Sequence, residues 1–206
     1  IAALARSGRV CGRSDHIERA VRAAEFLAAR MSRPDGSLLH RYRDGEAAIE
    51  GMLDDYAFLS WGLLELYEAT FDERYLERAI AHTRFMLDHF LDDDSGGFFM
   101  TRRGGETLLA RPREVYDGAL PSGNSVAALN LIRLSRFTGD MEYDRRGRAV
   151  IDAFGAQVAR APMAHCALLM AVDYALGPSF EIVIVGKRGG EGVALMRAAG
   201  DRVSAP

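Results

Sequence analysis

Apolar residues recur at helical spacing through most of the chain, and the helices they predict are of two alternating kinds. One kind, seen at 52–70, 125–137 and 163–176, is apolar nearly all round, which is typical of a helix buried on most faces. The other kind carries a single apolar stripe and a charged face, which indicates a position on the outside. The predicted helices span residues 1–11, 15–31, 52–70, 73–91, 124–138, 140–159 and 163–176.

The connections between these helices alternate too. Each apolar helix passes to the next helix through a tight turn, and the aspartate of a turn such as Thr138-Gly139-Asp140 can cap the helix that follows. The returns at 32–51 and 92–123 are long, and each contains a glycine turn, a β-like run and a hairpin turn (Asp44-Gly45; Gly104-Gly105). The repeat is therefore helix, tight turn, helix, hairpin.

Helix pairs stacked with their apolar members inward predict a mainly α fold, an α/α toroid of antiparallel helix hairpins over residues 1–177. An open solenoid is the rival arrangement, because it is also a repeat array of helix pairs. The segment at Ile1 begins without a cap, so we expect further helix pairs before it. Residues 178–206 change character and predict the start of a βα appendage. The glycine-rich loop at 186–190 is interpreted as a connection rather than a phosphate site.

Composition narrows the classes of function. The 206 residues are 49% hydrophobic, enough to bury a core, and the net charge of -3 gives no basic field for nucleic acid or a membrane surface. No apolar run reaches the roughly 20 residues that span a bilayer. A cytoplasmic location is expected, with targeting before Ile1 left open. Cys11 and Cys166 lack metal-ligand spacing and are expected to be reduced and buried. No metal or cofactor is predicted.

Alternating helix directions place the N-terminal ends of the inner helices, together with both long returns, at one end of the predicted toroid. We call this end the pole. Unpaired backbone N–H groups and helix dipoles there favour anionic or polyhydroxyl ligands. Loops on a rigid scaffold are also where functional residues concentrate. A small, sugar-like ligand is therefore expected at the pole.

The first polar cluster at the pole contains Asp54, Asp55 and Tyr56. Acidic residues in a first helical turn are commonly capping groups, and one aspartate is enough for that role. Neighbouring residues point about 100° apart, so the second aspartate can face the toroid axis. We expect Asp55 and Tyr56 to face inward, with Asp54 contributing to binding and Trp61 in the core.

The second cluster precedes the helix predicted at 124–138. Its expected substrate-binding residues are Arg111, Tyr116, Ser122 and Asn124, although Ser122 or Asn124 can equally be the N-cap of that helix. Asp117 supplies a second carboxylate. If the protein is a glycosidase, Asp55 and Asp117 are the expected catalytic pair.

Two of the histidines can reach the pole. His40 lies in the first hairpin and His165 begins the last inner helix, and both are expected at the binding site. A histidine there is a ready base, as a sugar epimerase would need. His16, His82 and His89 lie on outer helices and are expected at the surface.

The segments 53–70, 117–125 and 181–186 resemble the YyaL-like family, also called the spermatogenesis-associated protein 20-like, thioredoxin-domain-containing family. The resemblance implies an N-terminal thioredoxin-like domain followed by a six-hairpin toroid related in fold to N-acylglucosamine 2-epimerases and several glycosidases. This chain would hold the second half of the toroid, with the missing N-terminal half as its partner. The family has no settled reaction, and this chain contains no Cys-x-x-Cys motif that would carry a redox role.

Two classes of function follow. The leading hypothesis is a carbohydrate-active or carbohydrate-binding toroid, either glycosidase-like or epimerase-like. The alternative is a non-catalytic binding or scaffold module that accompanies the thioredoxin-like domain. Both rest on analogy of fold, since the residues localise a site without naming a reaction.

Overall fold

The computed structural model describes residues 1–105, 110–178 and 198, and its fold is mainly α, as predicted. Most of the appendage predicted at 178–206 lies outside the described residues. The elements are α1 (Ala2–Val10), α2 (Ser14–Arg30), β1 (Leu39–Arg43), β2 (Glu46–Glu50), α3 (Leu53–Thr70), α4 (Glu73–Phe90), α5 (Gly123–Thr138), α6 (Met141–Arg160), the short 3-10 helix η1 (Pro162–Ala164) and α7 (Cys166–Leu176).

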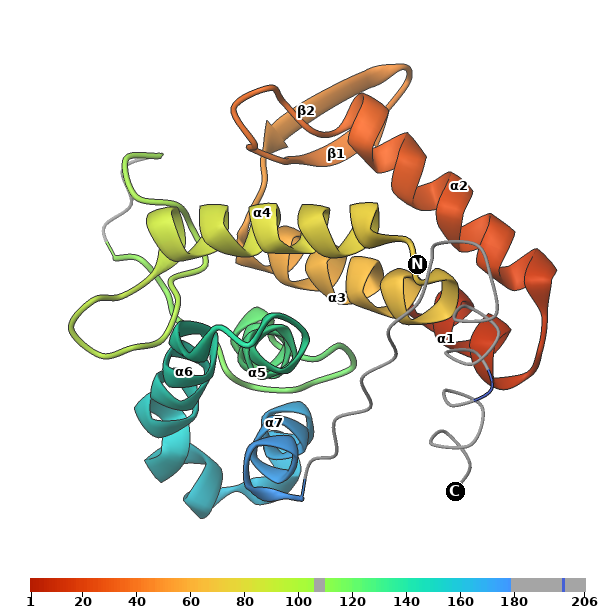
Figure 1. Cartoon of the computed structure of the whole chain (residues 1–206). Coiled ribbons are helices and arrows are strands. Elements are labelled where there is room, and N and C mark those ends of the chain that lie inside the picture. Colours follow the sequence, from red (N-terminus) through yellow and green to blue (C-terminus); the bar gives the residue numbers. More distant parts are fainter. Residues whose placement is uncertain (106–109, 179–197, 199–206) are drawn as a thin grey trace.

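The long helices form two layers (Figure 1). In the inner layer α3 lies between α1 and α5, and α5 lies between α3 and α7. In the outer layer α2 packs on α1, α4 on α3, and α6 on α5. The all-round apolar character of α3 and α5 explains their inner position, because such helices bury most of their faces. The predicted alternation of inner and outer helices is confirmed.

The tight turns have the predicted caps. Asp72 accepts a hydrogen bond from the Arg74 N–H at the start of α4, and Asp140 does the same for Glu142 in α6. Gly139 ends α5 with a φ of 72°, a left-handed conformation that glycine adopts without strain. These caps fix where each outer helix begins.

The first long return forms the predicted hairpin. β1 and β2 pair antiparallel, with Leu39 opposite Glu50 and Arg41 opposite Ala48. This register places His40 across from Ile49, whose φ of 66° is unusual for a β-branched residue. The second return differs from the prediction: its described residues contain an isolated bridge between Leu91 and Phe98 and no paired strands. Residues 106–109 lie outside the description.

The last inner helix is more exposed than predicted. α7 begins at Cys166 rather than at Met163, which lies in η1 and is 92% exposed. Met170 and Leu176 are exposed as well, because the described helices α5 and α6 contact one side of α7. The expectation that this segment is buried on most faces is therefore wrong.

Two further burial predictions are wrong. His82 is buried, because it falls on the inward stripe of α4 with Ala79 and Met86 at spacings of three and four residues. Cys11 and Cys166 are exposed, since each lies at the end of a helix rather than within its inward stripe. No described helix combines the length and apolar character needed to cross a membrane.

Candidate functional site at the pole

The pole consists of the N-terminal ends of α3, α5 and α7, which begin at Leu53, Gly123 and Cys166, and the loops that enter them. The fully buried Asn124 joins the second return to α5. Its carboxamide accepts a hydrogen bond from the Phe98 N–H (2.8 Å) and donates to the carbonyls of Phe98 (3.0 Å) and Glu114 (2.8 Å). Its polar atoms are therefore used to hold the loop.

Ser122 is the N-cap of α5, as one of the two predicted alternatives has it. Its hydroxyl accepts a hydrogen bond from the Ser125 N–H at 3.1 Å. Asp117 bridges the ends of two inner helices: one carboxylate oxygen accepts from the Ser122 N–H (2.8 Å) and the other from the N–H groups of Ala167 (2.8 Å) and Leu168 (3.2 Å). The structure thus gives Asp117 the contacts of a helix cap.

Tyr56 and Arg111 also pack against neighbouring rings. Tyr56 is buried and stacks on Phe85 of α4 with ring centroids 5.0 Å apart, while its hydroxyl accepts a hydrogen bond from the Leu38 N–H. Burial raises the pKa of Tyr56. Arg111 lies over the Phe99 ring, 4.1 Å from its centroid, and donates to the Thr101 carbonyl. Burial lowers the pKa of the Arg111 guanidinium.

The two histidines predicted at the pole differ in accessibility. His165 is buried, and its Nδ1 donates to the Val115 carbonyl at 2.9 Å. The side chain of His40 is 47% exposed, and its Nδ1 lies 2.9 Å from Asp55 Oδ2. Of these two, His40 is the one that a ligand can reach. Tyr116, predicted to bind substrate, is also open, with 59% of its surface exposed.

The two adjacent aspartates have the reverse of the expected roles. Asp55 reaches back to accept the Met52 N–H at 2.8 Å, which is the capping-box contact of the third residue of a helix. Its expected inward position is therefore wrong. Asp54 instead lies against the start of α5, where a methyl group added to Gly123 would overlap its Oδ1 atom. The sequence alone does not show which of the two aspartates caps α3, because that depends on the residue at which the helix begins.

The surroundings of Asp54 favour the protonated form of its carboxyl group. Its Oδ1 is buried without a hydrogen-bond partner among the described residues. Burial raises the pKa of the Asp54 carboxyl, and the charges of Asp55 and Glu114 raise it further, while the Gly123 amide and His40 act in the opposite direction. A carboxyl group that keeps its proton at higher pH is suited to general acid catalysis.

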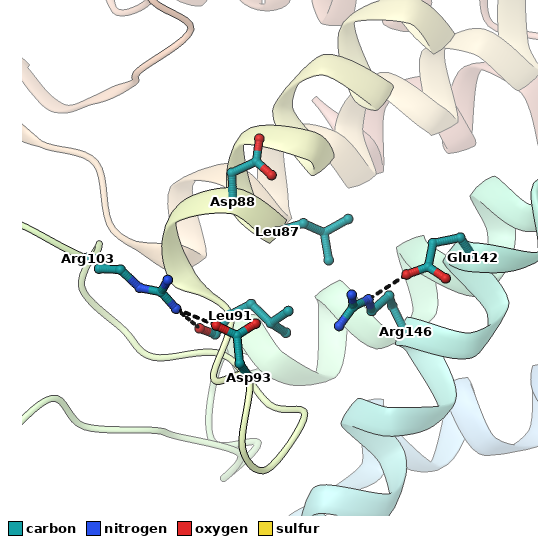
Figure 2. Close-up of a pocket in the computed structure, with 7 residues that line it drawn as sticks. All are labelled: Leu87, Asp88, Leu91, Asp93, Arg103, Glu142 and Arg146. Atoms are coloured by element: carbon teal, nitrogen blue, oxygen red, sulfur yellow. Dashed lines mark hydrogen bonds and ion pairs between the residues drawn. The ribbon is translucent and has the colours of Figure 1, made fainter.

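A separate pocket of about 380 Å³ lies between the end of α4 and the start of α6 (Figure 2). Two ion pairs occupy its wall, Arg103 with Asp93 and Arg146 with Glu142, each with an N–O distance of 2.7 Å. Leu87, Asp88 and Leu91 complete the lining. Asp54, Asp55 and His40 do not line this pocket, so it is distinct from the pole. Within the described residues, no group of three His, Cys, Asp or Glu side chains is placed to hold a metal ion.

Comparison with known proteins finds relatives that are similar to this chain in sequence. It is 33% identical to human spermatogenesis-associated protein 20 over 192 residues, which is 88% of this chain and 24% of that protein. The rat protein of the same name is 32% identical over 196 residues, 90% of this chain and 25% of that protein. The chain therefore spans about a quarter of the length of these relatives. No protein-family model matches the chain.

Among solved structures, the chain is similar to a possible member of the GH105 family from Klebsiella pneumoniae. The TM-score is 0.53 at 18% identity, and the match covers 79% of this chain and 42% of that one. At this identity the likeness concerns the fold, which is the α/α toroid of helix hairpins predicted from the sequence. Over about 90% of its length, the chain is therefore a homologue of the proteins named spermatogenesis-associated protein 20, in agreement with the resemblance seen in its sequence.

Proposed function

We propose that this chain forms the part of a carbohydrate-active α/α toroid that carries the general acid, and that this acid is Asp54. The observation that carries the proposal is the position of Asp54 at the N-terminal end of an inner helix, where its Oδ1 is buried against Gly123 and makes no well-aligned hydrogen bond among the described residues. The likeness of fold to a possible GH105 family member is consistent with it. The sequence-based choice of Asp55 and Asp117 is less favourable, because backbone amides already occupy both carboxylates.

In this proposal the Asp54 carboxyl donates its proton to the leaving oxygen as the glycosidic C–O bond breaks, and a water molecule adds to the anomeric carbon and releases a proton to solvent. Asp55 keeps the His40 ring in place, with its exposed edge available to a ligand hydroxyl. The raised pKa of Asp54 supports the role of acid, since the carboxyl must be protonated before it can donate.

An assay of glycan binding and hydrolysis with the 206-residue protein tests the proposal. Asp54→Asn should lower turnover on a hydrolysed glycan by about 10²-fold or more, because it removes the proton donor and leaves the shape of the site. Asp88→Asn on the exposed face of α4 is the matched control and should leave turnover unchanged. Absence of glycan binding, or equal turnover of the two variants, would contradict the proposal. Binding without turnover would favour the binding-module alternative.

A further inference from the structure

The inner helix α3 presents an aromatic and acidic face away from its outer partner. Tyr56 marks the side of α3 that packs on α4, where it stacks on Phe85. An α-helix turns about 100° per residue, so residues at 54, 58, 61 and 65 lie roughly 140–180° from Tyr56. Their side chains are Asp54, Phe58, Trp61 and Glu65. Phe58 and Trp61 are partly exposed, unlike the fully buried Leu63 and Leu64 nearby.

Trp61 is held in one orientation by a buried ionic network. Its indole Nε1 donates to Glu65 Oε1 at 3.2 Å, and the same oxygen lies 3.0 Å from a guanidinium nitrogen of Arg133 in α5. The side chains of Glu65 and Arg133 are 2% and 8% exposed, and Arg133 also pairs with Glu68 at 2.7 Å. A partly exposed aromatic surface fixed by buried charges is the arrangement of a preorganised binding site.

Phe58 extends this aromatic surface toward the pole. Its ring centroid lies 6.4 Å from that of Trp61, with the planes tilted by 36°. Seven residues separate Asp54 from Trp61, a rise of about 10 Å along the helix. The acid and the two rings therefore follow one another along one face of α3, which we call the strip.

The charges along this strip favour a ligand without negative charge. Near Asp54, the negative charges of Asp55 and Glu114 both raise the pKa of its carboxyl, and the His40 ring acts against them. A carboxylate on a ligand would be repelled there. At the other end, Arg133 and Arg9 are paired with Glu65 and Glu68, so they offer no net attraction for an anion.

We infer that Phe58 and Trp61 form a stacking platform for a sugar ring adjacent to the one acted on at Asp54, so that the site takes a neutral oligosaccharide of at least two rings. The apolar face of a sugar ring packs on aromatic side chains, while its hydroxyl groups reach polar partners at the edge. This inference rests on the proposed function and adds the class of ligand and the residues that select it.

The single tryptophan makes the inference directly measurable, because all tryptophan fluorescence arises at position 61. We would titrate the 206-residue protein with cellobiose, chitobiose, glucose and glucuronic acid, following tryptophan emission and, in parallel, heat by calorimetry. A disaccharide should bind with a saturable change in emission, and glucuronic acid should not bind. Trp61→Ala should weaken disaccharide binding by about tenfold, the scale of one aromatic stacking contact.

Substitutions distinguish the role of the aromatic platform, Phe58 and Trp61, from that of Asp54. Asp54→Asn should retain disaccharide binding, whereas Phe58→Leu, which keeps an apolar side chain but removes the ring, should weaken it. This test is independent of whether Trp61→Ala folds. Phe26→Ala on the exposed face of α2 is the aromatic control and should bind as the parent does. Disaccharide binding that leaves the emission and the Phe58→Leu affinity unchanged would overturn the platform and leave the proposed function standing. Absence of heat with every sugar would overturn both.

Discussion

Asp54 and Gly123 occupy adjoining first turns of two inner helices, with the Asp54 carboxylate in the space that a side chain at position 123 would fill. This contact joins α3 to α5 at the pole. It also removes Asp54 from water, which is the main cause of its raised pKa. The close approach of the two helices therefore raises the pKa of Asp54, the property that a general acid requires.

Gly123→Ala should destabilise the protein, because the added methyl group overlaps both Asp54 and the Leu53 side chain. Overpacking of this kind costs about 1–3 kcal/mol, measurable by urea unfolding. Gly155→Ala is the matched control: position 155 lies within α6 with open space around it, so alanine should stabilise the helix by about 0.5–1 kcal/mol. Equal effects of the two substitutions would refute the close contact.

Replacing each of the two adjacent aspartates should have opposite effects on stability at pH 7. The folded pKa of Asp54 lies above its ordinary value, so the folded state binds more protons in that window and stability falls as pH rises through it. Asp54→Asn removes this loss and should be at least as stable as the parent. Asp55→Asn weakens the cap at Met52 and should cost about 1 kcal/mol. Urea unfolding at pH 5 and pH 7 checks both, and a destabilised Asp54→Asn would count against a desolvated carboxyl.

His82 should make stability depend on pH below neutrality. Burial lowers its pKa from 6.5 to about 4, so the folded state binds fewer protons than the unfolded state between these values. Its contribution is complete above pH 6.5 and is lost as pH falls toward 4, by up to about 3 kcal/mol. His82→Leu should flatten the pH dependence of urea unfolding in this range. His89→Gln, on the same helix and partly exposed, should keep the slope of the parent.

Arg133→Ala should be strongly destabilising, because it leaves the buried carboxylate of Glu65 without its closest cation. Breaking one side of a buried ion pair costs about 3–5 kcal/mol. Arg146→Ala removes a surface pair with Glu142 and should cost less than about 1 kcal/mol. Thermal unfolding of the two variants gives the comparison, and similar melting temperatures would show that the Arg133 network is not essential to the fold.

The fold was largely predictable from the sequence, whereas the roles of the polar residues were not. Helical periodicity depends on residue type alone, so it located α3, α4, α5 and α6 to within a few residues. Asp117 and Asn124 have the residue types of a sugar site, but contacts with Ala167 and Phe98, distant in sequence, give them structural roles. Such long-range hydrogen bonds leave no local pattern.

The predictions of burial failed where the inward-facing side of a helix was misjudged. His82 was predicted at the surface because it lies on an outer helix, although its spacing from Ala79 and Met86 places it on the inward stripe. The helical spacing of Asp54, Phe58 and Trp61 on one face could likewise have been found in the sequence. Trp61, predicted in the core, packs against the core and is partly buried. In both cases the helical spacing shows which face of the helix carries the side chain.

An NMR pH titration of the Asp54 carboxyl carbon, with and without cellobiose, tests the central claim most directly. The structure predicts that this carbon titrates above the ordinary range of aspartate, because the carboxyl is desolvated and adjacent to Asp55. Cellobiose should also shift its resonance, while leaving that of Asp88 unchanged. An Asp54 carbon that titrates near 3.8 and does not respond to any sugar would contradict the assignment of the pole as a carbohydrate site.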